Sequence, residues 1–184
     1  MGVRTVNRAI FLDRDGVLTQ AVVRDGKPYP PANAAAVRLV DGAPEALALL
    51  KQRGFLLLVV TNQPDVARGT QTMEELSAIN QVLQDALPLD AILICPHDSA
   101  DACSCRKPKP GLLLTAATRW QLDLPACYMI GDRWRDIDAA AAAAVPAIWI
   151  DYEYNERGPS APPAARVKDL REAVHWIPHQ ESEL

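Results

Sequence analysis

Two aspartates stand two residues apart in the segment Asp13-Arg14-Asp15-Gly16, directly after residues 6–12, which have strand character. A carboxylate in the first position can attack phosphorus and form an aspartyl-phosphate, which divides one difficult substitution into two easier ones. A carboxylate in the second position can protonate the leaving oxygen and later deprotonate a water molecule. The alternative is a plain polar turn, because Asp and Gly also favour turns for local reasons.

A further aspartate, Asp132, follows another apolar segment, residues 127–130. Mg²⁺ prefers hard oxygen ligands and keeps several water molecules. Asp132, Asp13 and the main-chain carbonyl of Asp15 therefore predict a Mg²⁺ site. Asp136 lies one helical turn after Asp132 and can orient the Mg²⁺ ligands without binding the ion itself. The alternative is an ordinary acidic residue in the first turn of a helix.

Lys107 and Thr61 offer a point positive charge and a hydroxyl donor. Phosphoryl transfer depends mostly on positioning and on neutralising the equatorial oxygens, and these two side chains can do both. Taken alone, a Lys-Pro dipeptide is normally just surface, so the role of Lys107 depends on its neighbours.

Three cysteines and one histidine crowd into residues 95–105, as Cys95, His97, Cys103 and Cys105. Three soft sulfurs and an imidazole form a ligand set for tetrahedral Zn²⁺, and with four protein ligands the zinc would be structural. Free thiols in a surface loop are the alternative. The spacing differs from that of nucleic-acid-binding fingers, and no basic recognition helix follows.

The elements that must position these residues alternate between strand and helix. Prolines and glycines make residues 14–40 a long irregular segment in this prediction. The alternation predicts an α/β fold, a three-layer Rossmann-like parallel sheet, whose strand ends should bring Asp13, Asp15, Thr61, Asn62 and Asp132 to one edge. The predicted strands are residues 6–12, 55–60, 91–94, 127–130 and 147–150, and the predicted helices are 43–53, 72–86, 110–121, 135–144 and 169–177.

Composition agrees with an ordinary globular chain. The 184 residues are 49% hydrophobic and 23% charged, which predicts a single domain over residues 1–184. A net charge of −4 gives no overall attraction to nucleic acid or to a membrane surface. The apolar run near the N-terminus is too short for a signal peptide, and no stretch approaches the roughly 18 apolar residues of a membrane span. We therefore expect a cytoplasmic monomer without nucleic-acid or membrane partners.

With these residues assembled, the chain resembles the haloacid dehalogenase superfamily of phosphatases over nearly its whole length. Four motifs carry the resemblance in order: Asp13-Arg-Asp15-Gly, Thr61-Asn62, Lys107, and Gly131-Asp132-Arg-Trp-Arg-Asp136. The segments TNQPDVARG, CPH with CSCRKPKPG, and GDRWRD are similar to the zinc-containing branch of D-glycero-D-manno-heptose 1,7-bisphosphate 7-phosphatases and histidinol phosphatases. That branch lacks a large cap domain.

The resemblance implies a role for each matching residue. Asp13 is expected as nucleophile and Mg²⁺ ligand and Asp15 as acid/base, with the Asp15 main chain and Asp132 as further Mg²⁺ ligands. Thr61 and Lys107 are expected to stabilise the phosphoryl group. The remaining matches imply Asn62, Arg106 and Arg133 as substrate-binding residues and Cys95, His97, Cys103 and Cys105 as zinc ligands.

The leading hypothesis is therefore a Mg²⁺-dependent phosphomonoester hydrolase that removes the 7-phosphate of D-glycero-D-manno-heptose 1,7-bisphosphate. Pro64-Asp65 replaces the Ser-Gly usual after Thr-Asn-Gln, which leaves the substrate open. The connection between His97 and Cys103 is shorter than in some heptose enzymes, which alters the rim of the site but not the zinc ligand set. Histidinol phosphate or another small sugar phosphate is the nearest rival. From other classes, a catalytically silent zinc-containing scaffold and a zinc-dependent nucleic-acid binder are weaker alternatives.

Overall fold

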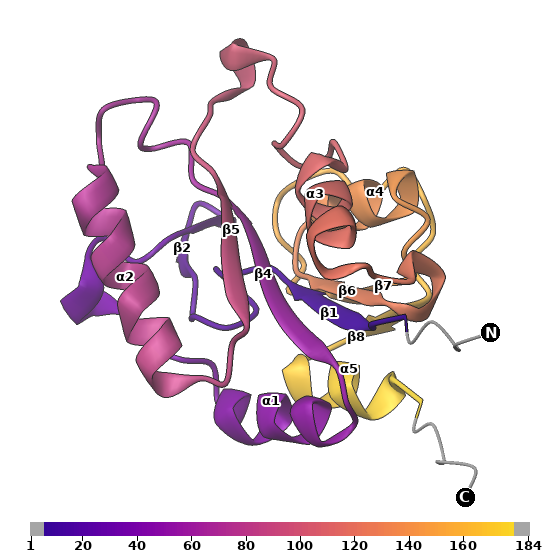
Figure 1. Ribbon diagram of the computed structural model, residues 1–184. Coiled ribbons are helices and arrows are strands. Elements are labelled where there is room, and N and C mark those ends of the chain that lie inside the picture. The colour runs from indigo at the N-terminus through magenta and orange to yellow at the C-terminus, as the bar shows by residue number, and fades with distance from the viewer. Residues whose placement is uncertain (1–5, 179–184) are drawn as a thin grey trace, which may run out of the picture.

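A six-stranded parallel sheet forms the centre of the protein in the computed structural model, which describes residues 6–178. The strand order is β5-β4-β1-β6-β7-β8 (Figure 1). The chain builds outward from β1 through β4 to β5, then returns to place β6 on the other side of β1. This reversal lies between β1 and β6, the kind of position at which open α/β sheets bind ligands. The strands are β1 (Ala9–Leu12), β4 (Leu56–Asn62), β5 (Ala91–Cys95), β6 (Tyr128–Gly131), β7 (Ala147–Ile150) and β8 (Ala165–Val167).

Helices cover both faces of the sheet, because its strands are apolar on both sides, as parallel strands usually are. In β1, Ile10 and Leu12 face a core shared with α1 (Ala43–Gln52) and α5 (Leu170–Trp176). Ala9 and Phe11 face a second core shared with α3 (Gly111–Trp120) and α4 (Trp134–Ala142). The remaining long helix, α2 (Met73–Ala86), begins at a capping box between Thr72 and Glu75. The three-layer α/β fold expected from the sequence is confirmed.

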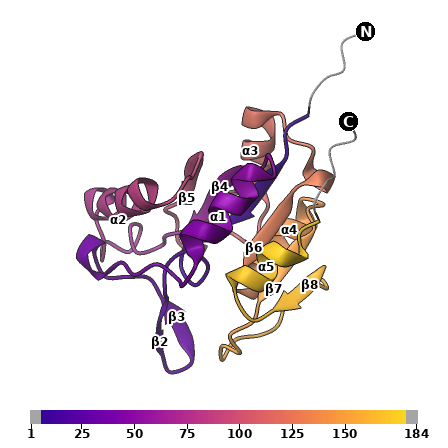
Figure 2. The same cartoon turned by 90° about the horizontal axis from the view of Figure 1, so that it is seen from below.

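Residues 13–42, between β1 and α1, form no separate cap domain. They contain the antiparallel hairpin of β2 (Val22–Arg24) and β3 (Lys27–Tyr29) and one 3-10 turn, Ala34–Ala36. The prediction of a wholly irregular segment is therefore wrong in part. The hairpin projects from the body in Figure 2, and at its tip the carbonyl of Gly26 accepts a hydrogen bond of 2.7 Å from the backbone N–H of Asn155.

Two further boundaries differ from the prediction. Strand β4 continues through Thr61 and Asn62, because these residues pair with Ile94 and Cys95 of β5. Strand β8, absent from the prediction, pairs with β7 after the proline-rich residues 158–163. No helix in residues 6–178 combines the length and the apolarity that a membrane span requires.

Candidate active site

The strand ends converge on a buried cluster of three carboxylates. Asp13 follows β1, Asp132 follows β6, and Asp136 lies in the first turn of α4. One oxygen from each lies within 4.8 Å of the others, and all three residues are buried. Gathering three carboxylates costs free energy unless a cation balances them, so the cluster has the chemistry of a metal site.

Among the three carboxylates, Asp132 fits a cation site most clearly. Both of its carboxylate oxygens are buried, and neither receives a hydrogen bond of normal geometry from the described residues, although Tyr154 lies nearby. Burial, and after it the charges of Asp13 and Asp136, raises the pKa of Asp132 well above its usual value. Gly16 makes room for this carboxylate, because a Cβ atom on Gly16 would stand 1.9 Å from Asp132 Oδ2.

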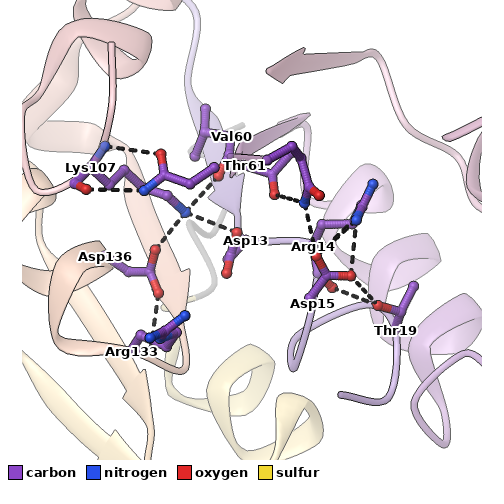
Figure 3. A network of polar contacts seen from close by, with 11 residues as sticks. Asp13, Arg14, Asp15, Thr19, Val60, Thr61, Lys107, Arg133 and Asp136 are labelled. Carbon is purple, nitrogen blue, oxygen red and sulfur yellow. Dashed lines mark hydrogen bonds and ion pairs between the residues drawn. The ribbon is translucent and has the colours of Figure 1, made fainter. Parts of the chain in front are cut away.

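Lys107 reaches into the same cluster from the loop before α3 (Figure 3). Its Nζ lies 2.8 Å from Asp13 Oδ1, 2.5 Å from Asp136 Oδ1 and 2.7 Å from the carbonyl oxygen of Val60. Burial opposes the charged ammonium group, but the two carboxylates outweigh burial and raise the pKa of Lys107. Burial also raises the pKa of Asp13 to about 6, against the opposing charge of Lys107. The lysine is thus held charged beside Asp13.

Asn62 fixes the backbone that carries this lysine. Its Nδ2 donates to the Lys107 carbonyl and its Oδ1 accepts from the Lys107 N–H, each at 3.0 Å. This reciprocal pair ties the end of β4 to the loop before α3. The Asn62 side chain, predicted to bind substrate, therefore already serves to place Lys107.

Asp15 is held by a separate network, visible on the right of Figure 3. Arg14, whose side chain is fully buried, donates to both Asp15 oxygens, and Thr19 Oγ1 donates to Asp15 Oδ1 at 2.9 Å. Gln63 Nε2 donates to Asp15 Oδ2 and to Thr61 Oγ1, each at 2.9 Å. Gln63 and Arg14 were not among the residues predicted to act at the site, yet both position Asp15. Their position in the sequence could have indicated this role, because Gln63 directly follows Thr61-Asn62 and Arg14 lies between Asp13 and Asp15.

A cavity of about 310 Å³ opens above these groups. Its lining includes residues 27–30, at and just after β3, and four arginines, Arg68, Arg106, Arg133 and Arg135. Arg133 Nε donates to Glu156 Oε2 at 3.0 Å, and Arg106 Nη1 donates to the carbonyl of His97 at 3.0 Å. Among the residues predicted from sequence, those that line the cavity are Asp13, Asp15, Thr61, Asn62, Arg106, Lys107 and Arg133, whereas Asp132 lies buried beside Asp13.

The predicted zinc ligands also come together. Cys105 Sγ lies 3.0 Å from Cys95 Sγ, 3.5 Å from Cys103 Sγ and 3.3 Å from His97 Nδ1. Sulfurs around a tetrahedral zinc ion with Zn–S bonds of about 2.3 Å would be about 3.8 Å apart, so a small expansion of this cluster accommodates the ion. All three thiols are free, as is the separate Cys127.

Comparisons with known proteins agree with this geometry. The model of the haloacid dehalogenase-like hydrolase family matches residues 31–144. The D-glycero-beta-D-manno-heptose-1,7-bisphosphate 7-phosphatase of Escherichia coli O6:H1 is 38% identical over 149 residues, covering 74% of this chain and 75% of the relative. The Helicobacter pylori enzyme of the same name is 32% identical over 94% of this chain and 98% of its own length.

A solved structure is similar over the same extent. The D,D-heptose 1,7-bisphosphate phosphatase from B. bronchiseptica, crystallised with magnesium and phosphate, superposes with a TM-score of 0.79 at 31% identity. The match covers 92% of this chain and 97% of that one. As the motifs predicted, the chain belongs to the haloacid dehalogenase-like hydrolase family.

Proposed function

We propose that this hydrolase is a Mg²⁺-dependent phosphatase that removes the 7-phosphate of D-glycero-D-manno-heptose 1,7-bisphosphate. One observation carries the phosphatase chemistry of this proposal: Asp13 lies buried in the cavity with the ammonium group of Lys107 2.8 Å from its Oδ1. A buried carboxylate and a buried cation side by side can attack a phosphoryl group and neutralise its oxygens.

In the proposed reaction, an Asp13 carboxylate oxygen attacks phosphorus as the bond from phosphorus to the sugar oxygen breaks. Asp15 gives its proton to that departing oxygen. Asp15 then takes a proton from water, whose oxygen attacks the aspartyl-phosphate and returns Asp13 to a carboxylate. The hydrogen bonds from Arg14, Thr19 and Gln63 hold Asp15 in one orientation for both proton transfers.

Asp13, Asp132 and the main chain of Asp15 would hold Mg²⁺, with Asp136 close by. The fit rests on the three converging carboxylates and on the unbonded oxygens of Asp132. When bound, the ion would neutralise negative charge on the transferred phosphoryl group. Thr61 and Lys107 line the cavity beside Asp13 and would bind the equatorial oxygens.

Cys95, His97, Cys103 and Cys105 would hold a structural Zn²⁺. Its effect on the site would be indirect, because Arg106 and Lys107 follow Cys105 immediately and Arg106 donates to the His97 carbonyl. Four filled ligand positions leave no open site for catalysis at this ion. Thiol ligands also suit a reducing compartment, so we propose a cytoplasmic enzyme. We also propose that the enzyme acts as a monomer.

The heptose bisphosphate is proposed because relatives with that name span most of this chain and because arginines line the cavity. Histidinol phosphate would need a carboxylate free to bind its amine. Asp65 is already paired with Arg68 at 3.3 Å, and Glu156 with Arg133, so neither acidic side chain is free. A doubly phosphorylated sugar therefore fits the charges better.

Phosphate release with Mg²⁺ from a panel of substrates tests the proposal. The panel contains both anomers of the heptose bisphosphate, histidinol phosphate and other sugar phosphates. We expect a preference of at least about a hundredfold in kcat/KM for a heptose bisphosphate, roughly 2.7 kcal/mol of differential transition-state binding. Flat, slow turnover across the panel would contradict the substrate and leave the chemistry in place.

The covalent step has its own test. Asp13→Asn should abolish turnover while circular dichroism and zinc content stay unchanged, because the amide is a poor nucleophile of the same shape. Normal turnover by this variant would remove the aspartyl-phosphate mechanism, and a catalytically silent scaffold would show no turnover even in the wild-type protein.

A further inference from the structure

Four arginines line the cavity, and they differ in their partners. Arg68 pairs with Asp65 and Asp98. Arg133 pairs with Glu156, and Arg106 donates to His97 and lies 3.9 Å from Asp98. Arg135 has no carboxylate within ion-pair distance anywhere in residues 6–178, and no hydrogen bond from its side chain to those residues is present. Its guanidinium group instead lies over the ring of Trp134, 4.5 Å from the centroid.

This arrangement is unfavourable for the free protein. Arg135 is partly buried, and charged side chains are seldom buried without a partner. Burial, followed by repulsion from Arg133, lowers the pKa of Arg135, and the opposing charges of Glu156 and Asp136 do not outweigh them. The carboxylates nearest to Arg135 are paired with other cations, Glu156 with Arg133 and Asp136 with Lys107, so Arg135 has no ion-pair partner of its own within residues 6–178.

Trp134, the ring under Arg135, is also contacted by a second arginine. Arg157 also lies over Trp134, 3.4 Å from the ring centroid, and its Nη2 lies 2.9 Å from Asp138 Oδ2. A guanidinium that lies over an aromatic ring makes no hydrogen bond to it through its N–H groups, which stay available to a ligand. Arg135 can thus offer two parallel donors to a phosphate, the geometry that makes arginine a strong phosphate ligand.

Arg135 lies close to the catalytic residues, both in the sequence and in the cavity. The next residue, Asp136, is paired with Lys107 beside Asp13, and Arg135 lines the same cavity as Asp13. We propose that Arg135 binds the second phosphate of the substrate, the one that Asp13 does not attack, and so determines specificity for bisphosphates. This inference rests on the proposed phosphatase function and adds a residue to its substrate site.

The test compares a bisphosphate with a monophosphate. The kcat/KM of wild-type protein and of Arg135→Gln is measured with D-glycero-D-manno-heptose 1,7-bisphosphate and with the 7-phosphate alone. Charge-assisted hydrogen bonds of this type predict a loss of roughly 10- to 100-fold for the bisphosphate, chiefly through KM. The loss for the 7-phosphate should be several times smaller, so the preference for two phosphates collapses. Arg135→Lys keeps the positive charge but loses the paired N–H donors of the guanidinium group. Its preference in kcat/KM for the bisphosphate should lie between those of wild type and Arg135→Gln.

Arg119 provides a matched control. It also lies over a neighbouring tryptophan, 4.7 Å from the ring centroid of Trp120, but on α3 and outside the lining of the cavity. Arg119→Gln should leave both kcat/KM values within about twofold of wild type, since exposed substitutions away from a site change little.

Calorimetry with heptose 1-phosphate, the proposed product that keeps the second phosphate, separates the inference from the proposed function. Binding at least about tenfold weaker in Arg135→Gln supports the inference even if the wild-type protein hydrolyses another bisphosphate faster. Failure of the wild-type protein to turn over the heptose bisphosphate overturns the proposed substrate alone. Equal losses with both substrates, or unchanged binding of heptose 1-phosphate, overturn the role of Arg135.

Discussion

Asp136 and Lys107 form a buried ion pair, with Oδ1 and Nζ 2.5 Å apart. Asp136 also accepts a hydrogen bond of 3.0 Å from the backbone N–H of Arg133, at the start of α4. One carboxylate therefore connects the lysine, the helix that follows β6 and the backbone of an arginine in the cavity wall.

The pair predicts a coupled loss of stability. Lys107→Met leaves the carboxylates of Asp13 and Asp136 buried without their cation, so the free energy of unfolding at pH 7 should fall by about 3–5 kcal/mol. Adding Asp136→Asn removes one of those charges and should recover at least about 1 kcal/mol. Urea denaturation of the two single variants and the double variant, without Mg²⁺, measures the coupling. Strictly additive losses would show that the pair is not coupled.

Gly16 predicts a selective loss of metal binding. Its φ is +92°, and in Gly16→Ala the new methyl group would overlap Asp132 Oδ2. Activity should then need at least about ten times more Mg²⁺, as measured by magnesium titration. Gly69→Ala is the control, because Gly69 also has a positive φ, +71°, but has open space where its Cβ would lie. It should cost about 1 kcal/mol of stability and leave the magnesium titration unchanged. The same Mg²⁺ dependence in both variants would contradict the prediction.

The cysteine cluster predicts that zinc content and activity fall together. Cys105→Ser removes a proposed ligand next to Arg106 and Lys107, so the variant should bind less than one zinc per chain, melt at a lower temperature and lose kcat. The same substitution at Cys127, outside the cluster, should keep the zinc. Elemental analysis, thermal melting and phosphate release provide the three measurements. Full zinc content and activity in Cys105→Ser would exclude the structural role.

Asp138 predicts a dependence of stability on pH. Burial opposes its charge, but Arg157 and the backbone N–H groups of Ser160 and Ala161 outweigh burial and lower its pKa. A lowered pKa in the folded state stabilises the protein fully above the unfolded value near 3.8, and the contribution is lost as pH falls through the folded value. Asp138→Asn should therefore lower the free energy of unfolding by about 1.5–3 kcal/mol at pH 7.

Denaturation at several pH values checks this sign. The difference between wild type and Asp138→Asn should shrink as the pH falls below about 4, because Asp138 itself becomes neutral. A difference that stays constant down to pH 3, or that grows there, would show that the ion pair with Arg157 does not stabilise the fold.

The motif residues were predictable because a parallel sheet leaves little freedom at the ends of its strands. Asp13, Thr61 and Asp132 each lie at or just after the end of an apolar run, and the register of β1 with β4 and β6 brings them together. The zinc ligands were predictable for a different reason, since three thiols and one imidazole within 11 residues must lie near one another.

The parts that could not be predicted depend on contacts between distant residues or on very short strands. Strands β2 and β3 have three residues each, and Pro28 interrupts the usual strand pattern. The partner of Arg133, Glu156, lies 23 residues away, and the partner of Arg14, Asn80, lies 66 residues away. Neither spacing has a local signature, so only the folded chain reveals these pairs.

The three contacts of Lys107 leave its ammonium group with no spare donor, since an ammonium carries three N–H bonds and Val60, Asp13 and Asp136 take them all. An arriving phosphate oxygen must exchange with one of these acceptors instead of simply adding to the set. The attraction between Lys107 and the phosphate of the bound substrate is therefore weakened. Lys107 should stabilise the transition state more, because negative charge on the phosphoryl oxygens is greatest there. Because the free site already neutralises its own charges, we expect Lys107 to bind inorganic phosphate less tightly than the transition state.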